Sequence, residues 1–87
     1  MQRIDKPIRI VVKTDIWGVV TPIRFQAEND GEERFTIAVD KVLNYFDDRE
    51  AGGSIRRFVC RSIVEDRVRQ YELSMDLATT RWYISRW

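Results

Sequence analysis

Apolar and polar residues alternate along most of the chain with a period of two, which is typical of half-buried β-strands. The clearest case is the last hairpin, within residues 71–84. A four-residue loop at 77–80 would put Met75 opposite Trp82 on an apolar face, and a one-residue slip would expose Trp82 to water. This pattern predicts an antiparallel sheet with one buried side. The pairs that share the apolar face are Met75–Trp82 and Leu73–Ile84.

The first predicted hairpin joins two strands whose apolar side chains recur at every second position. Pairing Val12 with Val19 brings Ile10 beside Thr21, so the inward residues of the two strands agree. Pro22 would then point outward. Because proline lacks a backbone N–H, we expect an edge, a bulge or a bend there.

Two later turns predict the remaining registers. The sequence Asn29-Asp30-Gly31 is typical of a three-residue hairpin loop whose glycine adopts the left-handed conformation. That loop places Phe25 opposite Phe35. A tight turn at residues 64–67 pairs the next two strands in a register that agrees with the last hairpin. The other pairs predicted by these turns are Ile23–Ile37, Cys60–Tyr71 and Phe58–Leu73.

The alternation changes phase after Asp40, in the segment 42–46. This segment fits either a bulged continuation of the third strand or one helical turn capped by Asp40, and we favour the strand. The polar stretch 47–53 ends in two glycines and is interpreted as a loop.

These patterns predict one all-β domain over residues 1–87, with about six antiparallel strands in two consecutive three-stranded meanders. Two apolar faces of this size form either a small barrel or two packed sheets. We favour the barrel, because closure removes exposed sheet edges. The predicted strands are residues 7–13, 19–27, 33–39 and 54–63, followed by the two strands of the last hairpin. The predicted core is Phe25, Phe35, Ile37, Phe58, Tyr71, Leu73, Met75, Trp82 and Ile84.

Three motifs span most of residues 20–84: Pro22-x-x-Phe25, then Phe35-x-Ile37-x-Val39-x-x-Val42-x-x-Tyr45, then Tyr71-Glu72-Leu73-x-x-Asp76-x-x-x-x-Arg81-Trp82-x-Ile84. Together they resemble a small family of β-rich bacterial domains of unknown function, and the third motif is the most specific. The resemblance implies no established activity. It also implies an association, in actinobacteria, with Y-family translesion DNA polymerases, and so a DNA-repair context. The chain departs from the family pattern at Tyr45, where the family has tryptophan, and at Thr80, where it has glycine.

Thr80 is an unusual residue for the end of a four-residue hairpin loop. After a type I turn, such a loop commonly ends in a residue with positive φ, which suits glycine and strains a β-branched side chain. We therefore expect either a positive φ at Thr80 or a different turn.

Composition excludes several classes of function. The 87 residues include 15 Lys and Arg, 14 Asp and Glu and no histidine, which gives a net charge of +1. Without histidine or an activated nucleophile, we expect no catalytic residues, no metal site and no cofactor. The lone Cys60 excludes an internal disulfide and is interpreted as a buried apolar residue. The chain lacks a transmembrane-length apolar run and the apolar core of a signal peptide, so we expect a cytoplasmic location.

Charge is unevenly placed although its sum is small. Acidic residues gather at the predicted turns, whereas arginines lie along the strands. Basic strand faces with acidic rims are the chain's only electrostatic asymmetry. The strand arginines are Arg9, Arg24, Arg34, Arg57, Arg61, Arg81 and Arg86.

The outer face of the last three strands is the predicted interaction surface, because it combines arginines, aromatic rings and a second apolar patch. We expect a non-enzymatic module that contacts an unknown protein partner, or a second copy of itself, and no membrane. The alternative is a small β-barrel that binds single-stranded nucleic acid, since rings stack on bases and guanidinium groups bind phosphates. The candidate residues are Arg57, Val59, Arg61, Ile63, Val68, Gln70, Tyr83 and Trp87.

Trp17 lies beside Gly18 in the first predicted turn. It is interpreted either as a plug that closes one end of the barrel or as an exposed contact residue, and we favour the plug.

Overall fold

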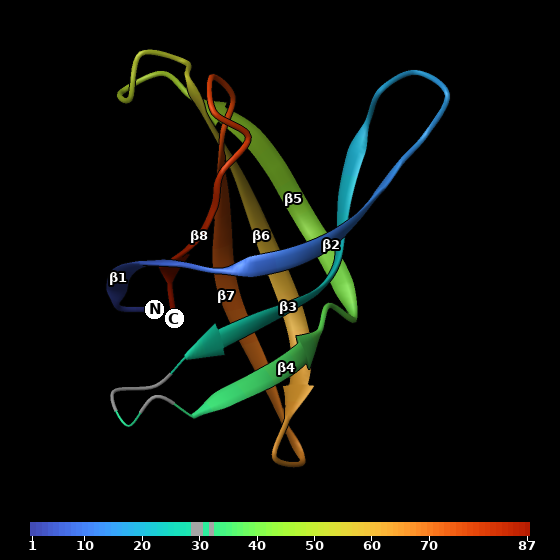
Figure 1. Cartoon of the computed structure of the whole chain (residues 1–87), viewed down its shortest axis with the longest axis vertical. Helices are drawn as coiled ribbons and strands as arrows, with labels where there is room; N and C mark the ends of the chain where they lie inside the picture. Colours follow the sequence, from blue (N-terminus) through green and yellow to red (C-terminus); the bar gives the residue numbers. More distant parts are fainter. Residues whose placement is uncertain (29–30, 32) are drawn as a thin grey trace.

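The chain forms eight antiparallel β-strands in two sheets (Figure 1). The computed structural model describes residues 1–28, 31 and 33–87. Over these residues there is no helix, and hence none long and apolar enough to cross a membrane. The five-stranded sheet has the order β1-β8-β7-β6-β5, and the three-stranded sheet the order β2-β3-β4. The strands are β1 (Arg3–Pro7), β2 (Arg9–Thr14), β3 (Val20–Glu28), β4 (Arg34–Ala38), β5 (Lys41–Asp48), β6 (Ile55–Val64), β7 (Arg67–Asp76) and β8 (Trp82–Arg86).

The all-β antiparallel class is confirmed, but the closed barrel and the strand number of about six are wrong.

The chain passes between the two sheets at two corners. At one corner the Ile8 N–H donates to the Trp82 carbonyl at 3.1 Å, and at the other the Asp40 N–H donates to the Arg61 carbonyl at 3.0 Å. Figure 1 shows the three-stranded sheet crossing β6 and β7 steeply, so the apolar faces of the two sheets meet.

The alternation of apolar residues does not indicate β1. Its sequence is mostly polar, and only Ile4 is half-buried. It pairs with β8 at the other end of the chain, with Lys6 opposite Ile84. Just beyond these strands Gln2 and Trp87 exchange backbone hydrogen bonds of 2.7 and 2.8 Å. Both termini therefore lie side by side (Figure 1), and β8 is paired on both of its edges.

The segment 42–46 lies within β5, so a bulged strand is confirmed over the helical turn, but its predicted continuity with the third strand is wrong. Val42 lies opposite Cys60 and Asn44 opposite Val59, which leaves Leu43 as an extra residue in β5. The bulge accounts for the change of phase in the sequence. Because β4 ends at Ala38, β5 is a separate strand that belongs to the other sheet.

The registers predicted for the last two hairpins are confirmed, in the last hairpin as far as the Leu73–Ile84 pair. Cys60 lies opposite Tyr71 and Met75 opposite Trp82. The turn between β6 and β7 has two central residues, Glu65 and Asp66, with φ of 51° and 62°. Two positive φ values are typical of a type I′ turn, whose twist matches that of the flanking strands. The other confirmed pairs are Phe58–Leu73 and Leu73–Ile84.

The register predicted for the first hairpin is wrong. Val12 lies opposite Pro22 rather than Val19, because the loop spans residues 15–19, and farther along β3 Ile23 is an extra, bulged residue. This bulge exchanges the two faces of the strand, so Pro22 is buried and Ile23 is 37% exposed. A bulge at this proline was one of the expected alternatives, whereas its outward orientation was not correct.

The second hairpin is shifted by two residues from the predicted register. Phe25 lies opposite Ile37 rather than Phe35, and the shift keeps both residues on the inner face. Phe35 instead lies opposite Ala27 and is 41% exposed, so its predicted place in the core is wrong. The predicted turn at Asn29-Asp30-Gly31 falls largely outside the described residues.

The core lies between the two sheets and joins them through aromatic contacts. The rings of Phe25 and Tyr71, from different sheets, have centroids 5.6 Å apart. Trp82 packs on Phe58 with centroids 5.1 Å apart. Cys60 is completely buried, as expected. The predicted core residues that are buried are Phe25, Ile37, Phe58, Tyr71, Leu73, Met75, Trp82 and Ile84.

Replacing Trp82 with alanine should strongly destabilise the fold. Trp82 is 7% exposed, and its removal should lower the free energy of unfolding by about 3–5 kcal/mol, much of the stability of a small domain. Denaturant unfolding measures this loss. Trp17→Ala is the matched control, because Trp17 is 81% exposed and its loss should leave the unfolding midpoint nearly unchanged. Equal midpoints for wild type and Trp82→Ala would contradict the packing described here.

The positive φ expected for Thr80 is confirmed, with a value of 60°. The Thr80 N–H donates to the Asp76 carbonyl at 2.7 Å, and the Asp76 N–H donates to the Arg81 carbonyl at 2.9 Å, which closes the four-residue loop. The Asp76 carboxylate accepts the Ala78 N–H at 2.9 Å and so stabilises the same loop. A β-branched residue is therefore held in the left-handed region.

Thr80→Gly should raise the free energy of unfolding by on the order of 1 kcal/mol, because glycine has no Cβ to strain at this φ. The greater freedom of glycine in the unfolded chain offsets part of the gain. Thr79→Gly is the control: Thr79 does not have a positive φ, so that variant should gain nothing. A Thr80→Gly variant no more stable than Thr79→Gly in urea would show that no strain is relieved.

Candidate functional site

All but one of the residues predicted to form the interaction surface share the outer face of β6, β7 and β8. Ile63 and Val68 lie opposite each other beside the β6–β7 turn and are 67% and 69% exposed. Toward the middle of the sheet the face becomes polar and half-buried. The residues on this face are Arg57, Val59, Arg61, Ile63, Val68, Gln70 and Tyr83.

Trp87 lies on the inner face, so its predicted place on the outer face is wrong. Glu72 pairs with Arg86 rather than with Ser85, because Ser85 is an extra, bulged residue in β8. The bulge exchanges the faces of the residues that follow it. As a result the ring of Trp87 packs on that of Tyr71, with centroids 5.3 Å apart.

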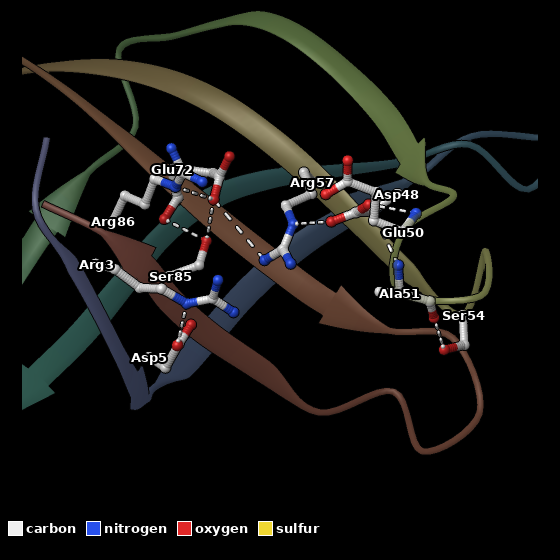
Figure 2. A network of polar contacts seen from close by, with 10 residues as sticks. All are labelled: Arg3, Asp5, Asp48, Glu50, Ala51, Ser54, Arg57, Glu72, Ser85 and Arg86. Atoms are coloured by element: carbon white, nitrogen blue, oxygen red, sulfur yellow. Dashed lines mark hydrogen bonds and ion pairs between the residues drawn. The ribbon is translucent and has the colours of Figure 1, made fainter.

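A network of ion pairs occupies the middle of the outer face (Figure 2). Glu72 is only 6% exposed, and its carboxylate accepts a hydrogen bond from Ser85 Oγ at 2.7 Å. The same carboxylate oxygen lies 3.6 Å from Arg86 and 3.8 Å from Arg57. Arg57 also donates to Asp48 at 3.0 Å, and this hydrogen bond lowers the pKa of Asp48. These arginines are therefore neutralised by carboxylates of their own sheet.

The buried polar groups of the core hold the sheets together. Ser62 Oγ donates to the Ala38 carbonyl at 2.6 Å and is hydrogen-bonded to the Tyr71 hydroxyl, which links β4 to β6 and β7. Burial raises the pKa of Cys60 to about 12 and that of Tyr71 to about 12, so neither ionises near neutral pH.

Within the described part of the chain, no group of three or more His, Cys, Asp and Glu could hold a metal ion.

The outer face of the three-stranded sheet carries a series of cations. The register places Arg34, Arg9, Arg24 and Lys13 in four successive rows. Neighbouring rows are two residues, or about 7 Å, apart along the strands, so one cation occurs at each step. We call this surface the basic face. Its rows across the sheet are Arg34–Glu28, Arg9–Gln26–Thr36, Arg24–Val11 and Lys13–Thr21.

Three of the four cations of the basic face differ from Arg57 and Arg86 in having no carboxylate partner. Arg34 pairs with Glu28 at 3.1 Å. Over the described residues, no carboxylate lies within ion-pair distance of Arg9, Lys13 or Arg24. The four rows contain four cations and one carboxylate, and so carry a local charge of +3.

Two adjoining hollows of about 470 and 320 Å³ run along the basic face and share Arg9 and Gln26 in their lining. The first extends to Arg34 and the second to Arg24 and Thr36. The Gln26 amide donates to the Thr36 hydroxyl at 3.4 Å, so neutral polar groups lie between the cations. This arrangement suits an elongated anionic ligand better than a single small anion.

Trp17 lies at the tip of the β2–β3 hairpin, and its predicted role as a plug is wrong. Trp17 and Ile16 are 81% and 88% exposed. Figure 1 shows this hairpin projecting beyond the rest of the molecule. This placement agrees with the other interpretation from the sequence, in which Trp17 is an exposed contact residue.

An apolar groove of about 280 Å³ lies between β3 and β5. Val19 and Pro22 line one side of it, and Leu43 and Tyr45 the other. β5 is the last strand of its sheet, and no described strand pairs with its outer edge. Three apolar residues of β5 remain partly exposed: Leu43 at 41%, Tyr45 at 54% and Phe46 at 43%.

The basic face was not predicted from the sequence, because alternation places these arginines outside but does not show which of them lack a carboxylate neighbour. Arg9, Arg24 and Arg34 were recognised only as strand arginines. The available signal was the alternation of Arg24 and Gln26 with Phe25 and Ala27, which places the polar pair outside.

No known family model, curated protein or solved structure matches this chain. The family resemblance of the three motifs therefore stays a prediction, and the function is inferred from the geometry of the surfaces.

Proposed function

We propose that this chain is a non-enzymatic module that binds a nucleic-acid strand through its phosphate backbone on the basic face. The observation that carries the proposal is the contrast between three cations of the basic face and the two arginines in the middle of the other sheet's outer face. Arg57 and Arg86 already contact the buried carboxylate of Glu72. Arg9 and Arg24 have no carboxylate beside them among the described residues.

Unpaired cations favour phosphate binding for two physical reasons. No internal ion pair has to be broken, and each phosphate contact releases a condensed counterion from the nucleic acid. Guanidinium groups also donate two hydrogen bonds at once to a phosphate. Cations in successive rows fit a chain that carries one phosphate per nucleotide, and the adjoining hollows give that chain a path along the sheet.

Binding of a fluorescently labelled single-stranded oligonucleotide should weaken steeply as salt is added. Contacts with three or four phosphates give a slope of about −2 to −3 in log affinity against log salt concentration, since each contact on a single strand contributes about 0.7. Arg9→Gln and Arg24→Gln should each weaken binding and make the slope shallower by about 0.7. Fluorescence anisotropy at a series of salt concentrations measures both quantities.

Arg61→Gln is the matched control. Arg61 lies on the five-stranded sheet, and its side chain is 42% exposed but pairs with Asp40 at 3.5 Å. It should leave the slope unchanged. Absence of binding at low salt, or equal slopes for wild type and Arg24→Gln, would rule out the basic face as a phosphate site. Equally tight binding of polyglutamate would identify an acidic protein segment as the ligand instead.

Protein contact is a second candidate function, and the free edge of β5 favours it. An unpaired edge strand with exposed apolar residues is a template for pairing with another chain. We propose a second copy of this chain as the occupant, because two β5 edges can pair antiparallel about a twofold axis, which is the commonest symmetry of soluble oligomers. The apolar groove beside Leu43 and Tyr45 would then be covered.

Tyr45→Glu should convert a dimer to a monomer in sedimentation equilibrium, because it puts a charge into the apolar groove beside β5. Val68→Glu is the control: Val68 is 69% exposed on the outer face of β7 and should leave the dimer intact. A dimer that survives Tyr45→Glu but is lost in Val68→Glu would place the contact on the outer face of β6–β8. Circular dichroism checks folding, since Tyr45 also stacks on Phe58 at 6.0 Å. A monomeric wild type at high protein concentration would contradict self-association.

A further inference from the structure

The tip of the β2–β3 hairpin continues the basic face beyond its last cation. Lys13 occupies the final row, and the strand ends at Thr14. The tip residues Ile16 and Trp17 follow directly and are 88% and 81% exposed. A polymer that follows the rows from Arg9 past Lys13 therefore runs toward this exposed tip.

The tip is held in a defined shape by its own hydrogen bonds. The Asp15 carboxylate accepts the backbone N–H groups of Trp17 and Val19, each at 2.9 Å. The Gly18 N–H donates to the Asp15 carbonyl at 3.0 Å, and Gly18 has a φ of 82°, which suits glycine. The one carboxylate at the tip thus serves the turn, and the two large apolar side chains are presented to solvent on an ordered loop.

Resting on the proposed function, we infer that Trp17 stacks on an unpaired base of the strand bound along the basic face, which makes the site selective for single-stranded nucleic acid. An indole offers a flat apolar surface to any base, so stacking adds affinity without sequence preference. In a duplex the bases are already stacked and paired, and the ring of Trp17 would find only the backbone. The cations bind phosphates in either case, whereas the ring distinguishes one strand from two.

The test compares a single-stranded oligothymidine with a duplex of equal length, using fluorescence anisotropy of the labelled nucleic acid. Trp17→Ala should weaken single-strand binding by on the order of tenfold or more and leave duplex binding unchanged. Its salt slope should equal that of wild type, because no phosphate contact is lost. Trp17→Phe keeps an aromatic ring and should retain most of the affinity, and Ile16→Ala should bind as wild type.

Tryptophan fluorescence provides an independent measurement. Trp82 is 7% exposed and Trp87 packs on Tyr71, so quenching by a bound base reports mainly on Trp17. Quenching should occur with the single strand in wild type and disappear in Trp17→Phe even though that variant still binds.

Two results would overturn the inference while leaving the proposed function intact. One is a Trp17→Ala variant that binds the single strand as tightly as wild type, while Arg24→Gln still weakens binding. The other is an equal loss of single-strand and duplex affinity in Trp17→Ala. If wild type binds neither nucleic acid at low salt, the proposed function fails and this inference fails with it.

Discussion

In the described strands, the face on which a side chain lies depends on the two-residue period of the strand and on the single bulged residues that reset it. An extra residue exchanges the two faces of the strand beyond it. Ser85 does this in β8, so that Arg86 lies on the outer face while Trp87 turns inward and packs in the core. Ile23 does the same in β3, where the bulge buries Pro22. The core and the polar surfaces are thus consequences of the same backbone irregularities.

Arg57 and Arg86 differ from the cations of the basic face because the five-stranded sheet buries the carboxylate of Glu72 on its outer face. Glu72 is 6% exposed, and a buried carboxylate without partners costs several kcal/mol. Arg57, Arg86 and Ser85 offset that cost, so their side chains are committed to the fold. In the three-stranded sheet the only acid in the cation rows is the exposed Glu28, which pairs with Arg34. The remaining cations of that face stay available to a ligand.

The local pattern of apolar and polar residues was sufficient to predict the register where strands are long and joined by tight turns. β6 and β7 each have ten residues and a two-residue turn, so their alternation permits one register, and Trp82 in the following hairpin is placed by the same logic. The bulge at Ile23 has no such signal except the neighbouring Pro22, and missing it put Pro22 on the wrong face of β3, while the long 15–19 loop shifted the pairing of the first hairpin. β1 could not be predicted, because its pairing with β8 joins the two ends of the chain. For the site, the sequence shows which arginines face outward but not which have carboxylates beside them.

A net charge of +1 gives no strong overall field for nucleic acid, but net charge is the wrong quantity for a molecule with two unlike faces. Charges act over about 8–10 Å at physiological salt, whereas even the shortest dimension of the molecule is 20 Å. The carboxylates that neutralise Arg57 and Arg86 lie on the outer side of the opposite sheet and are screened from Arg9 and Arg24. A ligand on the basic face therefore experiences the local charge of that face. The small total charge limits only long-range steering, which affects the rate of association more than the stability of the complex.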